Sequence, residues 1–259
     1  MTALISFVGA GPGAADLLTL RATDRLQQAD VVVWAASLVS EDVLAHCRAD
    51  AIVHDSKTMT LPEVLAVFTA HPTARIVRLH SGDPTVFSTI GEQIRWCEEH
   101  GRDYEIVPGV SSVAAAAAAA GCELTSPGVS QSVVLTRLAR RTAASMPARE
   151  RIATFAAAAP TMALFLSAAH PRELQEALLE PGSAYRADTP AVIVVRASWP
   201  DERVARTTVG QLASSLATLG ATTTTMVLVG DAVQGATERT SHVYDPSFTH
   251  RFRTGIADG

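Results

Sequence analysis

Short apolar runs rich in β-branched residues alternate with longer helix-like stretches along most of the chain. Runs such as Val31–Trp34 are uninterrupted, which is typical of strands that are covered on both faces in a mostly parallel sheet. Alternating strands and helices indicate an α/β fold. In the first half we expect strands at Ala3–Val8, Val31–Trp34, Ala51–His54, Ile76–His80 and Tyr104–Val107, and helices at about Ala14–Gln28, Glu41–His46, Leu61–Ala70 and Ile90–His100.

A break in this pattern comes at Gly121–Gly128, where glycine, proline, serine and threonine follow an alanine-rich helix. Two later strands are separated only by Ala197–Glu202, which predicts an antiparallel hairpin and hence a mixed second sheet. We therefore expect two α/β domains, residues 1–121 and 128–235, with a cleft between them and a tail at 236–259. The strands expected in the second domain are Ser132–Thr136, Met162–Ser167, Ala191–Arg196, Arg203–Thr208 and Thr224–Val229.

Composition narrows the function classes. The chain has 259 residues, of which 47% are hydrophobic, and a net charge of -5, so it has no basic footprint for nucleic acid. It lacks an apolar run near the roughly 20 residues of a membrane span and a basic, signal-like start, so we expect a soluble, cytoplasmic protein. Three widely spaced cysteines and histidines outside ligand spacing predict no metal site.

The first candidate loop is Gly9–Ala14, directly after the first predicted strand. It matches the G-x-G-x-x-A form of a dinucleotide fingerprint. However, Pro12 lacks an N–H that could bind phosphate, and no acidic residue follows the second strand to hold a ribose. A nicotinamide site is therefore disfavoured, and a tight turn that needs the freedom of glycine is the simpler alternative.

Two further loops follow predicted strands. In His80–Pro84, Asp83 stands at the carboxyl end of a strand, where open α/β sheets bind ligands; it could accept hydrogen bonds from a ligand or cap the next helix. In Pro108–Ser112, Ser111 or Ser112 could cap the alanine-rich helix, and capping is compatible with ligand contact.

The three loops together, in this order and spacing, resemble the tetrapyrrole (corrin/porphyrin) methyltransferase family. The similarity covers residues 3–253 and includes the stretches Ala35–Val39, Arg78–Gln93, Val107–Arg137 and Tyr244–Arg253. It implies S-adenosylmethionine as cofactor, an anionic tetrapyrrole (precorrin-4) as substrate, methylation at C-11 in cobalamin biosynthesis, and a homodimer. Cofactor contacts are implied at Pro12, Ser81, Gly82, Asp83, Val86, Ser111 and Ser112, and in the second domain at Leu166 on its strand, at Ala197, and at Thr224 or Thr225.

Methyl transfer from a sulfonium to an electron-rich carbon needs mainly alignment, which is consistent with the absence of a nucleophile–base constellation in the sequence. If a base removes a proton afterwards, His80 and Asp83 are the candidates. The substrate carries several carboxylates, so a net negative protein must bind it through local arginines. We expect Arg137, and with less support Arg140 and Arg141, to do so; a solvated loop is the alternative.

Other functions stay open at this point. Within the family, the substrate could be another precorrin, uroporphyrinogen III, ribosomal RNA or the diphthamide precursor, and the acidic balance weighs against RNA. Outside that chemistry, the chain could be a nicotinamide-dependent oxidoreductase or a tetrapyrrole carrier without catalysis. Intact loops at Asp83 and at Ser111 argue against a carrier.

Overall fold

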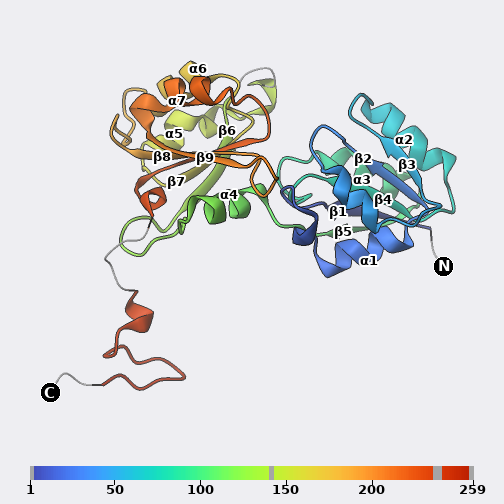
Figure 1. The fold of residues 1–259 in the computed structure, drawn as a ribbon, viewed down its shortest axis with the longest axis horizontal. Coiled ribbons are helices and arrows are strands. Elements are labelled where there is room, and N and C mark those ends of the chain that lie inside the picture. The colour runs from blue at the N-terminus through green and yellow to red at the C-terminus, as the bar shows by residue number, and fades with distance from the viewer. Residues whose placement is uncertain (1–2, 140–142, 236–240, 257–259) are drawn as a thin grey trace. The chain divides into compact units, whose positions relative to one another are not determined.

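The computed structural model describes residues 3–139, 143–235 and 241–256 (Figure 1). Two compact units make up the chain, and the α/β class is confirmed in both. The first unit is Met1–Ala116 together with Arg196–Arg203, and the second is Ala117–Val195 together with Val204–Gly259. The short segment Arg196–Arg203 thus belongs to the first unit, although the strands on either side of it belong to the second.

The first unit contains a five-stranded sheet in the order β3-β2-β4-β1-β5, and its paired strands are all parallel. The predicted strands match to within one residue at each end. The strands are β1 (Leu4–Gly9), β2 (Val31–Trp34), β3 (Ile52–Asp55), β4 (Ile76–His80) and β5 (Asp103–Val107). The α-helices are α1 (Leu20–Gln28), α2 (Leu61–Ala70) and α3 (Ile90–Glu99), followed by α4 (Ser112–Ala120), and the 3-10 helices are η1 (Ala15–Leu17) and η2 (Glu41–His46).

Helices cover both faces of this sheet, as the uninterrupted apolar strands predict. Leu26 of α1 packs with Val8 and Val32 on one face. Phe68 of α2 packs with Ile5 on the other face. Successive strand residues point to opposite faces, so a strand between two helical layers must be apolar throughout.

The predicted helix at Ala14–Gln28 is wrong in its first third. A 3-10 turn, η1, occupies Ala15–Leu17, and α1 begins only at Leu20. The reason is local: Thr19 is extended and its hydroxyl accepts a hydrogen bond from the Ala22 N–H at 3.1 Å, which makes it the N-cap of α1.

The second unit contains a mixed five-stranded sheet in the order β6-β7-β10-β8-β9. β6 and β7 are parallel, whereas β10 is antiparallel to both β7 and β8. The strands are β6 (Val133–Arg137), β7 (Thr161–Phe165), β8 (Pro190–Val195), β9 (Arg203–Thr208) and β10 (Thr225–Val229). The helices are α5 (Ile152–Ala156), α6 (Pro171–Leu178) and α7 (Leu212–Leu219), with short 3-10 helices at Ala143–Ser145, Ala148–Glu150, Val209–Gln211, Asp231–Gln234 and His242–Tyr244.

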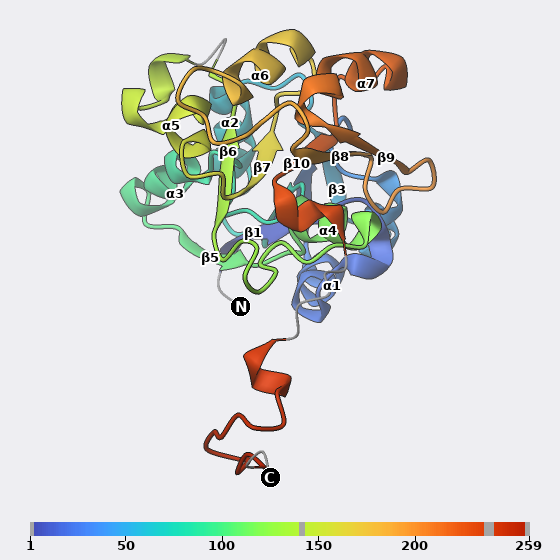
Figure 2. The ribbon, with the colours of Figure 1, turned by 90° about the vertical axis from the view of Figure 1, so that its left-hand side faces the viewer.

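The core of this unit lies between the sheet and helices α5, α6 and α7, which gather on one side of it (Figure 2). Leu164 of β7, Leu174 of α6 and Leu216 of α7 are almost completely buried there. β8 and β9, the strands of the predicted hairpin, are neighbours in the sheet. No helix in the described ranges has the length and apolar character to cross a membrane.

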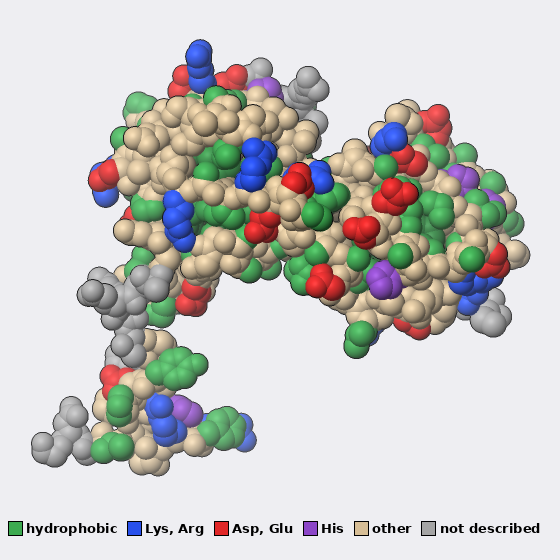
Figure 3. All heavy atoms as spheres, in the orientation of Figure 1, with side chains coloured by type: hydrophobic (Ala, Val, Ile, Leu, Met, Phe, Trp, Pro, Cys, Tyr) green, Lys and Arg blue, Asp and Glu red, His purple; other side chains and the backbone are tan. Residues whose placement is uncertain are grey.

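The C-terminal arm, residues 241–256, is built around one arginine. The Arg253 guanidinium donates hydrogen bonds to the carbonyl oxygens of Val243 at 2.8 Å and Asp245 at 2.6 Å. Large apolar side chains nevertheless remain on its surface (Figure 3): Tyr244 is 77% exposed and Phe252 is 85% exposed. The arm therefore has a defined local structure but leaves its aromatic side chains uncovered.

Candidate functional site

The three candidate loops meet at one edge of the first sheet. Strands β4, β1 and β5 are adjacent, and their carboxyl ends are in register: Gly9 pairs with His80, and Val8 pairs with Val107. We call the loops that follow these strands the glycine loop (residues 9–14), the GDP loop (residues 80–84) and the PGV loop (residues 108–112). Their proximity follows from the strand order, because the carboxyl ends of parallel strands share one edge.

Three glycines bring the loop backbones into direct contact. A Cβ atom on Gly109 would lie 2.2 Å from the Gly82 carbonyl oxygen, and one on Gly9 would lie 2.5 Å from the Gly109 Cα. Gly82 and Gly11 also form an antiparallel bridge, in which the Gly82 N–H donates to the Gly11 carbonyl at 2.7 Å. Both have positive φ angles, +68° and +72°, which favour glycine. Only backbone therefore fits where the three loops meet.

The carboxylate of Asp83 fastens the GDP loop to the PGV loop. Its Oδ2 accepts from the Gly109 N–H at 2.9 Å, and its Oδ1 accepts from the Thr85 N–H at 2.8 Å and from the Thr85 hydroxyl. Partial burial alone would raise the pKa of Asp83, but the hydrogen bonds from Thr85 and Gly109 hold this pKa below its usual value. Asp83 is therefore an ionised anchor at neutral pH, and any ligand contact uses its remaining lone pairs.

His80 is a poor candidate for a base. Its side chain is buried, with 7% exposed, and its Nε2 has no hydrogen-bond partner among the described residues. Burial, followed by the nearby positive charge of Arg78, lowers the pKa of His80 to about 3. An imidazole with so low a pKa takes up a proton only weakly at neutral pH, so the geometry argues against the base role raised from the sequence.

The other predicted positions of the first unit lie on or beside the three loops. Pro12 is buried in the glycine loop, and Ser81 precedes Gly82. A Cβ on Gly82 would lie 3.4 Å from the Ser112 nitrogen and 3.8 Å from the Ser111 Cα. The same Ser111 accepts from the Val113 N–H at 3.4 Å, so it also caps α4, and Val86 donates its N–H to the Asp83 carbonyl at 3.3 Å.

Ala197 belongs to the first unit as well, in the segment Arg196–Arg203. It is buried, and its neighbours Ser198 and Trp199 form hydrogen bonds with the glycine loop. The sequence predicted a hairpin turn here and a cofactor contact at Ala197, but it did not point to Ser198 or Trp199. A tryptophan in a short inter-strand loop was the available signal, in a chain where aromatic residues are 5% of the total.

The remaining predicted contacts lie in the second unit. Leu166 is not on its strand as expected: β7 ends at Phe165, and Leu166 follows it with a φ of +53° and 73% of its surface exposed. Thr224 has a φ of +48°, and Thr225 begins β10. Left-handed backbone at residues other than glycine is uncommon and clusters at functional sites, which makes Leu166 and Thr224 notable independently of any resemblance.

The predicted substrate arginines are only partly covered by the structure. Arg137 is the last residue of β6, rather than the first after it, and its guanidinium donates to the Ser145 hydroxyl at 2.9 Å. Arg140 and Arg141 lie outside the described residues.

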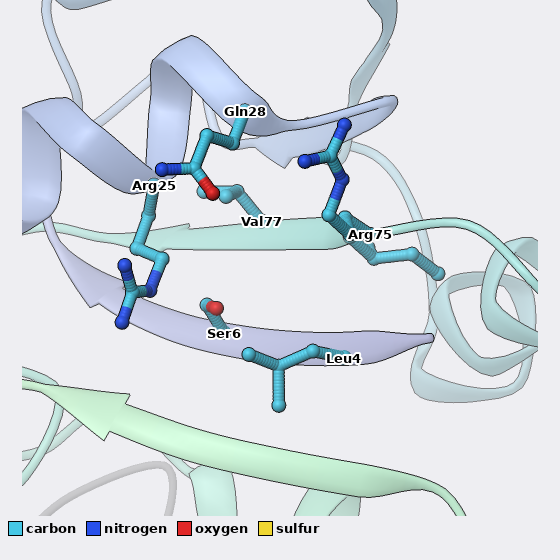
Figure 4. A pocket seen from close by; sticks show the side chains of 7 residues that line it. Leu4, Ser6, Arg25, Gln28, Arg75 and Val77 are labelled. Carbon is cyan, nitrogen blue, oxygen red and sulfur yellow. The ribbon is translucent and has the colours of Figure 1, made fainter. Parts of the chain in front are cut away.

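A pocket of about 290 Å³ lies elsewhere in the first unit, between α1 and the beginnings of β1 and β4 (Figure 4). Both arginines that line it form ion pairs. Arg25 pairs with Glu105, and the Arg75 Nη2 lies 3.4 Å from the Asp30 Oδ1. None of the predicted site residues lines it. The pocket is lined by Leu4, Ser6, Arg25, Gln28, Arg75, Ile76 and Val77.

Comparison with known proteins identifies the family of this chain. The family model described as Tetrapyrrole (Corrin/Porphyrin) Methylases matches residues 4–213. This chain belongs to the tetrapyrrole methylase family. The family resemblance inferred from the three loops is thereby confirmed, and the chain is an enzyme of the methyltransferase class.

Individual relatives of this tetrapyrrole methylase are similar over almost their whole length. It is 43% identical to the precorrin-4 C(11)-methyltransferase of Sinorhizobium sp, with 96% of this chain and 98% of the relative aligned. Among solved structures it resembles a cobalt precorrin-4 methyltransferase described as a cobalamin biosynthetic enzyme, at 40% identity and a TM-score of 0.84, covering 89% of this chain and 95% of that one.

A less similar structure was solved as a complex with a small molecule. It is the uroporphyrin-III C-methyl transferase of Thermus thermophilus, complexed with S-adenosyl homocysteine. This tetrapyrrole methylase is 28% identical to it, with a TM-score of 0.72, covering 89% of this chain and 93% of that one.

Proposed function

We propose that this tetrapyrrole methylase transfers the methyl group of S-adenosylmethionine to C-11 of precorrin-4, a step of cobalamin biosynthesis. The observation that carries the proposal is the contact of Gly9, Gly82 and Gly109 beside the Asp83 anchor. It lies at the carboxyl edge of a parallel sheet, where open α/β folds bind ligands. Similarity over nearly the full length to a protein named precorrin-4 C(11)-methyltransferase supports the choice of substrate.

The first unit offers a fitting place for the cofactor. No side chain fits where Gly9, Gly82 and Gly109 touch, so the three loops pack backbone against backbone at this point. Gly9 and Gly82 are buried there and Gly109 is half-buried. The Ser111 and Ser112 side of the PGV loop lies against Gly82, so polar groups from two loops converge. We assign the cofactor contacts in this unit to Pro12, Ser81, Gly82, Asp83, Val86, Ser111, Ser112 and Ala197. Leu166, Thr224 and Thr225 of the second unit stay predictions.

Bound S-adenosylmethionine supplies a methyl group on a positively charged sulfur, so that an electron-rich ring carbon can form the new C–C bond while the S–C electron pair returns to sulfur. The residues of the chain then need only to bind and align the reactants, and alignment of this kind contributes as much as about 7–11 kcal/mol in favourable cases. Asp83, ionised and already bonded to Gly109 and Thr85, keeps the loops in place. His80 stays neutral and buried beneath them.

The deciding experiment is an assay of the purified protein with methyl-13C-labelled S-adenosylmethionine and precorrin-4. We expect one labelled methyl group in the product, placed on C-11 by NMR. Parallel reactions with cobalt-precorrin-4 and uroporphyrinogen III identify the preferred substrate. Turnover of uroporphyrinogen III alone would contradict the proposal while leaving the methyl-transfer chemistry intact.

A second assay separates the alternatives that do not involve methyl transfer. Calorimetric titration with S-adenosylhomocysteine is run beside titration with NADPH. Binding of the former alone supports the methylase site. Binding of NADPH alone would favour an oxidoreductase. We do not expect this outcome, because the glycine loop is followed by η1 and not by the N-terminus of an α-helix, which is where dinucleotide-binding folds hold the pyrophosphate.

We also propose that two copies of the chain associate through the C-terminal arm. The support is the exposure of Tyr244, Phe252 and Ile256 on a segment whose backbone is held by Arg253. Aromatic side chains such as those of Tyr244 and Phe252 are enriched at interfaces. Light scattering behind size exclusion should give a dimer for the full chain and a monomer for a chain ending at Gly235. A monomeric full chain contradicts this assignment.

A further inference from the structure

Trp199, which is far from the glycine loop in sequence, forms a hydrogen bond with the backbone of this loop. The Trp199 indole N–H donates to the Pro12 carbonyl oxygen at 2.9 Å. The neighbouring Ser198 hydroxyl accepts from the Ala14 N–H at 3.0 Å. The two hydrogen bonds involve the peptide groups on either side of Gly13. The segment Arg196–Arg203 therefore binds the glycine loop at two points.

The absence of a side chain at Gly13 is explained by the same tryptophan. A Cβ atom on Gly13 would lie 2.2 Å from the Trp199 Cδ1 and 2.3 Å from its Nε1. Gly13 is not among the glycines with positive φ, so its backbone conformation is open to other residues. Glycine is needed at this position because the indole fills the space of a side chain.

The indole is itself held in place. The Arg196 guanidinium carbon lies 3.9 Å from the centre of the Trp199 ring, and the Arg196 Nε donates to Asp201 at 2.6 Å. The Ser198 N–H donates to the Glu202 carboxylate at 2.6 Å. Arg196 and Ser198 both have positive φ, +52° and +66°, a strained conformation that persists only where the surroundings over-determine it. The segment is therefore a fixed support rather than a loose turn.

We propose that Trp199 is a positioning residue for S-adenosylmethionine: its indole N–H fixes the Pro12 carbonyl and thereby holds the glycine loop in the shape that accepts the cofactor. A loop with three glycines in five residues has many accessible backbone conformations, and ordering it at the moment of binding would weaken affinity. Trp199 removes that cost in advance. The inference rests on the proposed function, because it takes the glycine loop as part of the cofactor site.

The first test measures the affinity for S-adenosylhomocysteine by calorimetry. Trp199→Phe keeps an aromatic ring but loses the N–H, and one hydrogen bond of ordinary strength corresponds to about fivefold weaker binding. Trp199→Ala should weaken binding further. The matched control is Trp96→Phe on α3, whose ring stacks on His100 at a centroid distance of 4.3 Å and should leave the affinity unchanged. Wild-type affinity in Trp199→Phe and Trp199→Ala, with only a lower melting temperature, overturns the proposal.

A double-mutant cycle tests the contact itself. Gly13→Ala should weaken S-adenosylhomocysteine binding at least about tenfold in the wild-type background, since overpacking must displace the indole or the loop. In the Trp199→Ala background the same change should cost much less, because the space is free. Equal costs in both backgrounds overturn the proposal. If the wild type itself does not bind S-adenosylhomocysteine, the proposed cofactor fails, and the melting temperatures of the same four proteins show separately whether Trp199 holds the loop.

Discussion

At the scale of single residues, Asp83 links the GDP loop to the PGV loop: one carboxylate oxygen accepts from Gly109 of the PGV loop, and the other accepts from Thr85, directly after the GDP loop. In Asp83→Ala the Gly109 N–H loses its acceptor, and a part-buried donor left unpaired costs about 1–3 kcal/mol. We expect a lower melting temperature and at least about tenfold weaker S-adenosylhomocysteine binding. The control is Asp103→Ala, at an exposed position, which should change neither the melting temperature nor the affinity for S-adenosylhomocysteine.

The lowered pKa of Asp83 makes the same stabilisation dependent on pH. Because the folded state takes up the proton less readily than the unfolded chain, the contribution is complete above the unfolded pKa of about 3.9. It is lost as the pH falls through the lower, folded pKa. The difference in melting temperature between wild type and Asp83→Ala should therefore be constant from pH 7 to 5 and shrink towards pH 3.

His80 gives a pH dependence in a different window. The unfolded chain protonates this histidine below about pH 6.5, whereas the folded chain resists protonation down to about pH 3. The unfolded state therefore binds more protons in this interval, and stability falls as the pH drops through it. Urea titrations at pH 7.5 and 5.0 give the free energy of unfolding at each pH. We expect it to fall less between these two pH values in His80→Leu than in the wild type. The control is His100→Gln, a substitution at an exposed position, which should lose as much stability as the wild type. An equal loss of stability in His80→Leu and in the wild type would contradict a buried, neutral His80.

Arg137 carries the prediction for the substrate. Replacing it with alanine should raise the KM for the tetrapyrrole about tenfold, since charge-assisted hydrogen bonds contribute roughly 1.5–3 kcal/mol, while the affinity for S-adenosylhomocysteine stays the same. Arg172→Ala, an exposed arginine on α6, is the control. An unchanged KM in Arg137→Ala means that the bond between Arg137 and Ser145 is only local structure.

At the scale of elements, the strand order β4-β1-β5 determines which loops become neighbours. The contact between them has no room for a methyl group, because a Cβ on Gly109 would lie 2.2 Å from the Gly82 oxygen. Gly109→Ala should therefore destabilise the protein by about 1–3 kcal/mol and abolish S-adenosylhomocysteine binding. Gly91→Ala on α3 meets nothing within 4 Å and should be neutral or stabilising by as much as about 1 kcal/mol. Urea unfolding of the two variants checks both, and equal stabilities would refute the close packing.

At the scale of the whole molecule, ligand binding and folding are linked. A ligand that binds only the folded chain at a concentration one hundred times its Kd adds about 2.7 kcal/mol of stability. S-adenosylhomocysteine should raise the melting temperature of the wild type accordingly, and adenosine at the same concentration should raise it less. Gly109→Ala should show no such rise in melting temperature. If the ligand raises the melting temperature of that variant as much as that of the wild type, it binds away from the three loops.

Local patterns in the sequence were sufficient for the α/β class, for the strands to within one or two residues, and for the family through the loops around Gly9, Asp83 and Ser111. The class and the strands depend on the periodicity and turn chemistry of neighbouring residues, whereas the family follows from the resemblance of the three loops to those of known members. Tertiary structure alone decided that Gly9, Gly82 and Gly109 touch, that Asp83 bridges two loops, that burial makes His80 a weak base, and that Trp199 replaces a side chain at Gly13. Each of these depends on contacts between residues far apart in the chain, and on the burial that those contacts create, so no local pattern records them.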